Sequence, residues 1–119
     1  MASSPGARFA AFSFVDRITA RGADGSISGR YTVPVHATRF PASLMAEAVG
    51  QLAAWGAMAR LDFAWRPVAG LAAATRYHAD VRPGDILELQ AQIVRCDAEA
   101  VAYGGRATIG GKLAIELVD

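Results

Sequence analysis

One segment of this 119-residue chain limits the fold more than any other, because residues 42–61 form a helical pattern that is apolar almost all round. Only Ser43, Glu47 and Gln51 make a polar stripe along it. A helix with so little polar surface is typical of a buried helix. Its two interior glycines each cost about 1 kcal/mol relative to alanine, which indicates close packing at those points. One helix face carries Leu44, Ala48, Leu52, Trp55 and Ala59.

The rest of the chain shows the two-residue alternation of β-strands. Two such runs precede the helix, at residues 9–20 and 26–33, and the first carries apolar residues on both faces, which predicts partial burial on two sides. Four runs follow the helix, at residues 71–80, 87–93, 100–109 and 112–117. Turn signals separate the runs at Gly22–Gly25, Arg82–Asp85 and Gly110–Gly111.

These runs predict an α+β protein with the order β-β-α-β-β-β-β. We expect an antiparallel sheet of about six strands that wraps its inner face around the one long helix. The length suits a single domain over residues 1–119, with residues 1–8 as a loose N-terminus.

Composition excludes several classes of protein. Hydrophobic residues make up 53% of the chain and the net charge is +1, so a disordered chain and a nucleic-acid-binding protein are both disfavoured. No segment is apolar enough to span a membrane and no signal peptide is evident, so we expect a cytoplasmic protein. The single cysteine, Cys96, excludes an internal disulfide and a cysteine-based metal site.

Glu47 is the first candidate for chemistry. A carboxylate on a buried helix is costly unless it is hydrogen-bonded or functional. Burial would favour its neutral acid form, which can donate a proton. Gln51 follows one turn later and could orient it. The alternative is that Ser43, Glu47 and Gln51 are simply the solvated edge of the helix.

The segment before the helix offers two further groups. His36 could act as a base at neutral pH, or could be a polar residue at the end of a strand. Residues 40–43 lead into the helix, where free N–H groups and the helix dipole could hold a carbonyl oxygen that gains negative charge. For His78, between Arg76 and Asp80, a structural interpretation is favoured.

Three segments, in this order, resemble the hot-dog-fold β-hydroxyacyl-ACP dehydratases of fatty-acid synthesis. Residues 12–18 read FSFVDRI, residues 40–51 read FPASLMAEAVGQ and residues 77–89 read YHADVRPGDILEL. The resemblance covers roughly residues 12–118. Two departures stand out: His36 lies eleven positions before Glu47, fewer than in the family motif, and Ala42 replaces a glycine.

The resemblance implies a homodimer or larger homo-oligomer in which two sheets join edge to edge. It implies an acyl-thioester tunnel at the subunit interface, with no metal and no redox cofactor. A histidine from one subunit and a glutamate from the partner's helix would remove water from the substrate. By position, His36 and Glu47 are the catalytic pair, while Phe40, Ala42 and Gln51 bind substrate. The substrate would be carried on the phosphopantetheine of acyl carrier protein or on CoA.

The first functional hypothesis is therefore a dehydratase-like lyase for 3-hydroxyacyl thioesters in fatty-acid or polyketide-type metabolism. A hot-dog acyl thioesterase that uses Glu47, without any need for His36, is the second. The third is a non-catalytic protein that binds acyl thioesters, which the altered loop after His36 would suit.

Overall fold

The computed structural model describes residues 13–36, 40–60, 69–71, 74–97 and 100–118. The predicted loose N-terminus, the start of the first predicted strand at residues 9–12 and the last predicted helix position, 61, lie outside these ranges. Within these ranges there is one helix, α2, which spans Ser43–Arg60. The strands are β1 (Arg17–Arg21), β2 (Ser26–Thr32), β3 (Ala69–Leu71), β4 (Ala74–Tyr77), β5 (Ile86–Cys96), β6 (Ala100–Ile109) and β7 (Lys112–Val118).

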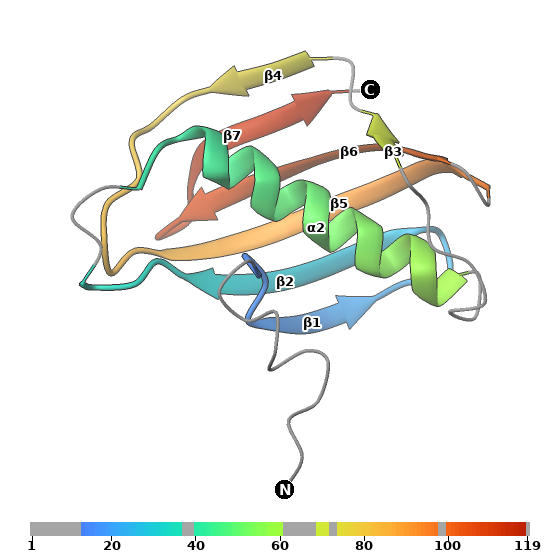
Figure 1. Cartoon of the computed structure of the whole chain (residues 1–119), viewed down its shortest axis with the longest axis horizontal. Helices are drawn as coiled ribbons and strands as arrows, with labels where there is room; N and C mark the ends of the chain where they lie inside the picture. The colour runs from blue at the N-terminus through green and yellow to red at the C-terminus, as the bar shows by residue number, and fades with distance from the viewer. Residues whose placement is uncertain (1–12, 37–39, 61–68, 72–73, 98–99, 119) are drawn as a thin grey trace, which may run out of the picture.

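The strands form a single sheet that lies behind the helix (Figure 1). Its order is β1-β2-β5-β6-β7-β4, and every neighbouring pair along this path is antiparallel. The predicted architecture, an antiparallel sheet packed on one long helix, is confirmed.

The predicted strand order needs one correction. The run predicted over residues 71–80 is two strands, because β3 pairs in parallel with β6 while β4 pairs with β7. The order within the described residues is therefore β-β-α-β-β-β-β-β. An alternating pattern reports which side of a strand is buried but not which strand it pairs with. A change of partner within one run therefore leaves no signal in the sequence.

The helix packs closely against the middle of the sheet. It lies over β5, β6 and β2, and its buried side carries Met45, Ala48, Val49, Leu52, Ala53, Gly56 and Ala57. A Cβ on Gly56 would lie 2.9 Å from Ile93 Cδ1, and a Cβ on Gly105 of β6 would lie 2.6 Å from Val49 Cγ1. The close packing predicted from the helical glycines is confirmed at Gly56.

Among the described residues, the sheet covers the helix on one side only. Trp55, predicted on the same face as the buried Leu52, is 42% exposed. The first predicted run, expected to be partly buried on two sides, is only half confirmed: Phe14 and Val15 are partly buried against the core, whereas all five residues of β1 are exposed. β1 is exposed because it lies at the edge of the sheet, whereas the helix packs on the central strands.

The predicted turns are confirmed and set the register of the hairpins. Gly110 and Gly111 both have positive φ, 57° and 81°, as a two-residue hairpin turn between β6 and β7 requires. Gly84 has φ 89° after Pro83, and the Asp85 N–H donates to the Arg82 carbonyl at 3.0 Å. This pattern is typical of a type II turn.

The two edges of the sheet differ in character. β1 carries Arg17 and Arg21 and has an irregularity between Ile18 and Ala20, features that discourage pairing with another strand. β4 is fully exposed, and Tyr77 at its end is 51% exposed. Within the part of the chain that the structure describes, no helix is both long and apolar enough to cross a membrane.

Candidate functional site

An aromatic cluster fixes the start of the helix. The Phe40 ring is buried against Phe14 and Tyr31, with ring centroids 6.1 and 6.0 Å away. Directly after it, the carbonyls of Pro41 and Ala42 accept hydrogen bonds of 3.0 Å from the first turn of α2. Such a start leaves the first N–H groups of the helix without partners inside the helix. The backbone needed to hold a carbonyl oxygen is therefore anchored, while the Phe40 ring itself lies in the core.

Gln51 ties the N-terminal segment to the helix. Its Oε1 accepts a hydrogen bond of 2.6 Å from the Phe14 N–H. The predicted substrate-binding residues Gln51 and Phe40 therefore both contact Phe14. Their role toward a substrate stays a prediction.

Glu47 lies in the second turn of α2 and is exposed in the single chain. Of the two alternatives that the sequence left open for Glu47, the single chain shows the exposed helix edge. The sheet covers the opposite side of the helix, so the position remains open to water or to a partner subunit. Among the eighteen helix residues, Glu47 is the only acid, and it lies near the positive end of the helix dipole.

A tyrosine that sequence reasoning missed reaches the helix one turn from Glu47. The Tyr103 ring on β6 is buried, with 9% of the residue exposed. Its hydroxyl reaches the helix at Gly50, where a Cβ would lie only 2.9 Å from the phenol oxygen. Burial raises the pKa of Tyr103, and the negative charge of Glu47 raises it further. The alternation of β6 places Tyr103 on the buried side with Val101 and Ala107, and this pattern was the available signal.

His36 lies on an exposed turn after β2. The chain here runs beside the Pro83–Gly84 turn, because the Val33 N–H donates to the Asp85 carbonyl at 2.9 Å and the Gly84 N–H donates to the Val33 carbonyl at 2.8 Å. Residues 37–39, which join His36 to the helix start, lie outside the described residues. Of the ion pairs between described residues, none joins His36 to Glu47. A pair formed across two subunits would show no such contact in one chain.

His78 has a structural partner. Its Nε2 lies 3.1 Å from Glu116 Oε1, and Arg76 Nη1 approaches the same carboxylate oxygen at 3.9 Å. All three side chains are on the outer, polar side of β4 and β7, which agrees with the structural interpretation favoured from the sequence.

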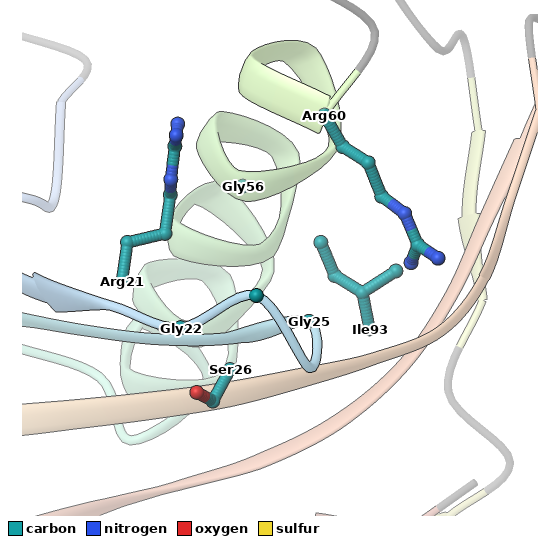
Figure 2. Close-up of a pocket in the computed structure, with 8 residues that line it drawn as sticks. Arg21, Gly22, Gly25, Ser26, Gly56, Arg60 and Ile93 are labelled. Carbon is teal, nitrogen blue, oxygen red and sulfur yellow. The ribbon is translucent and has the colours of Figure 1, made fainter.

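A cavity of about 150 Å³ lies at the opposite end of α2, under the turn between β1 and β2 (Figure 2). Arg21 and Arg60 lie on either side of Gly56 in this view. Arg60 comes thirteen positions after Glu47 on the helix, a distance of about 20 Å along the axis. This cavity is therefore separate from the residues grouped around Glu47.

Comparison with solved structures identifies the fold of the chain. No protein-family model matches the sequence, and no curated protein sequence matches it. Among solved structures, the dehydratase heterocomplex ApeI:P from Xenorhabdus doucetiae is similar over 87% of this chain and 79% of that chain, with a TM-score of 0.63 and 14% identity. The chain has the hot-dog fold. A thioesterase superfamily protein is similar over 84% of this chain, with a TM-score of 0.53 and 20% identity, and the chain spans 52% of its length.

Proposed function

We propose that this protein acts on acyl thioesters as a dehydratase-like lyase, with Glu47 as its acid. The observation that carries the proposal is the position of Glu47, the helix's only acid, on the open side of α2 close to a helix start that is anchored by packing. The similarity of the fold to a dehydratase complex supports the same reaction class.

The proposed reaction removes water from a 3-hydroxyacyl thioester. His36, from one subunit, takes the proton on the carbon next to the carbonyl. The electron pair forms the new carbon–carbon double bond, and Glu47 of the other subunit gives its proton to the departing hydroxyl, which leaves as water. The backbone N–H of Ala42 holds the thioester oxygen while negative charge develops on it. The substrate arrives on the phosphopantetheine of acyl carrier protein or on CoA.

The test is the reverse reaction, the addition of water to a crotonyl thioester. Its rate is measured from the loss of the ultraviolet absorbance of the thioester. We expect Glu47→Gln to lower the rate at least 100-fold, within the range that general acid–base catalysis contributes. Glu88→Gln is the matched control, because Glu88 of β5 is paired with Arg30 of β2 and alternates with buried Leu87 and Leu89, so its side chain is on the face of the sheet away from the helix. Equal rates for the wild type and Glu47→Gln would contradict the proposal.

A second comparison separates the lyase from a thioesterase. A lyase needs a base, so we expect His36→Ala to abolish hydration while His78→Ala leaves it unchanged. A thioesterase would release free thiol from acyl-CoA, depend on Glu47 and tolerate His36→Ala. The similarity to a thioesterase superfamily protein favours this as the second candidate. Binding of an acyl thioester without turnover, unaffected by Glu47→Ala, would instead indicate the non-catalytic protein.

We also propose that two copies of the chain pair through β4. The His78 N–H donates to the Ala114 carbonyl of β7. Because N–H groups alternate along a strand, those of Thr75 and Tyr77 point away from the sheet. A second β4 can pair with these groups, whereas the arginines and irregularity of β1 oppose pairing at the other edge.

Sedimentation velocity tests the pairing. We expect a dimer at micromolar concentration and a monomer for Thr75→Pro, which removes an outward N–H and leaves the hydrogen bonds to β7 intact. Thr19→Pro, at the irregular point of β1, is the control and should remain a dimer. A monomeric wild type would exclude the pairing and, with it, a site shared between subunits.

A further inference from the structure

We infer that Tyr103 is the positioning residue for Glu47, and that in the working site its phenol O–H, which makes no hydrogen bond to a described residue of the single chain, donates one to the Glu47 carboxylate. This inference rests on the proposed function, in which Glu47 is the acid. In this arrangement Tyr103 of β6 orients Glu47 within one subunit, whereas His36 comes from the other subunit.

The geometry of the helix brings the two groups together. The Tyr103 hydroxyl touches α2 at Gly50, where the missing side chain leaves room for it, because any Cβ there would lie 2.9 Å from the phenol oxygen. Glu47 lies three residues earlier, and on a helix such positions are neighbours whose Cβ atoms are about 5–6 Å apart. Side chains on a helix lean toward its N-terminus, so the space above Gly50 opens toward the turn that carries Glu47.

The chemistry of the phenol suits a donor. Among the residues that the structure describes, no hydrogen bond occupies the Tyr103 hydroxyl, and no buried polar side-chain atom is left without a partner. The Tyr103 hydroxyl is therefore not fully buried and is available to donate a hydrogen bond. Burial and the charge of Glu47 both raise the pKa of Tyr103, so the phenol keeps its proton at neutral pH. Glu47 is the ionisable group whose charge acts on it.

The consequence for catalysis is orientation. A hydrogen bond from Tyr103 to one oxygen of the Glu47 carboxyl group leaves the other oxygen free to face the substrate. Hydrogen bonds to charged groups contribute about 1.5–3 kcal/mol, which corresponds to roughly a 10- to 150-fold change in rate when the bond is needed in the transition state. Since Tyr103 does not touch the substrate, its loss should lower kcat and leave KM unchanged.

The experiment compares Tyr103→Phe with Tyr31→Phe, which removes a hydroxyl from another buried tyrosine, one whose raised pKa reflects burial and Asp16 rather than Glu47. We expect kcat for hydration of the crotonyl thioester to fall at least 10-fold in Tyr103→Phe at constant KM. Tyr31→Phe keeps the ring that packs on Phe40, so its kcat should stay well above that of Tyr103→Phe. Gly50→Ala, whose methyl group displaces the hydroxyl, should reproduce the loss. A kcat for Tyr103→Phe within twofold of wild type, with the fold intact by circular dichroism, would overturn the inference while leaving Glu47 as the acid.

A second readout needs no activity. Ultraviolet titration of tyrosinate at alkaline pH, with Tyr103→Phe used to identify the signal of Tyr103, should show that Glu47→Gln lowers the pKa of Tyr103 and that Glu88→Gln does not. If the wild type turns over no acyl thioester, the proposed function fails. This titration alone then decides whether Tyr103 interacts with Glu47. An unchanged pKa of Tyr103 in Glu47→Gln would then overturn the interaction between Tyr103 and Glu47 as well.

Discussion

The packing of the helix on the sheet can be tested at Gly105, in the middle of β6. A methyl group there would lie 2.6 Å from Val49 Cγ1 and would collide with the carbonyl oxygen of Gln90 on the neighbouring strand. Favourable contacts between carbon atoms need about 3.5–4.0 Å, so the helix and sheet must separate locally by about 1 Å. One of the two obstacles is backbone, which cannot rotate away as a side chain can.

The size of the effect follows from two opposing contributions. Overpacking a tight core costs about 1–3 kcal/mol, and a backbone collision places Gly105→Ala at the upper end of that range. Replacing glycine restricts the unfolded chain, which returns about 0.4–1 kcal/mol. We therefore expect a net loss of about 2 kcal/mol, a large part of the roughly 5–15 kcal/mol that stabilises a typical domain.

Gly56→Ala is the matched control within the helix. Its methyl group would lie 2.9 Å from Ile93 Cδ1 and 3.3 Å from Ile27 Cγ2, both of which belong to side chains that can shift. Alanine also favours the helix by about 1 kcal/mol over glycine. We expect stability within about 1 kcal/mol of wild type. Urea unfolding at one fixed protein concentration, followed by circular dichroism, measures both variants. Equal losses, or a wild-type midpoint for Gly105→Ala, would refute the packing argument.

Three further predictions concern individual hydrogen bonds and turns. Gln51→Leu removes the acceptor of the Phe14 N–H, so we expect the free energy of unfolding to fall by about 1–2 kcal/mol. The Phe14 amide should also exchange its hydrogen faster by NMR, and unchanged exchange would contradict this hydrogen bond. Ser26→Ala removes the hydroxyl that lowers the pKa of Asp24, which should then rise toward 3.8 in a carboxyl NMR titration. Because the folded pKa of Asp24 is the lower one, the stabilisation from this bond is present above pH 3.8 and is lost as the pH falls through the folded pKa. Gly84→Ala should cost about 1–2 kcal/mol in urea unfolding, because φ is 89° there, while Gly84→Asn should cost less; equal costs would point to sterics rather than backbone conformation.

Local patterns predicted most of the elements. The helix predicted over residues 42–61 is observed over Ser43–Arg60, and the strand predicted over residues 100–109 has the same bounds in β6. These elements depend on periodicity and on turn residues such as Gly110 and Gly111, all of which act within a few residues. Their signals are therefore present in the sequence itself.

Features that depend on distant residues were not predicted. The parallel pairing of β3 with β6 and the exposure of β1 depend on the position of each strand in the sheet. The contact between Tyr103 and Gly50 joins residues fifty-three positions apart, and no local pattern reports it. The same limit applies to His36 and Glu47, whose proposed partnership crosses two subunits and stays a prediction.

The β6–β7 turn has a practical consequence. No described residue lies within 4 Å of a Cβ built on Gly110 or Gly111, and the turn lies at the end of a hairpin. A short peptide inserted between these two glycines would extend the hairpin into solvent without disturbing the core. The turn therefore offers a place for a fluorescent label or an affinity sequence, through which the protein could be immobilised or followed during assembly with every catalytic candidate left unaltered.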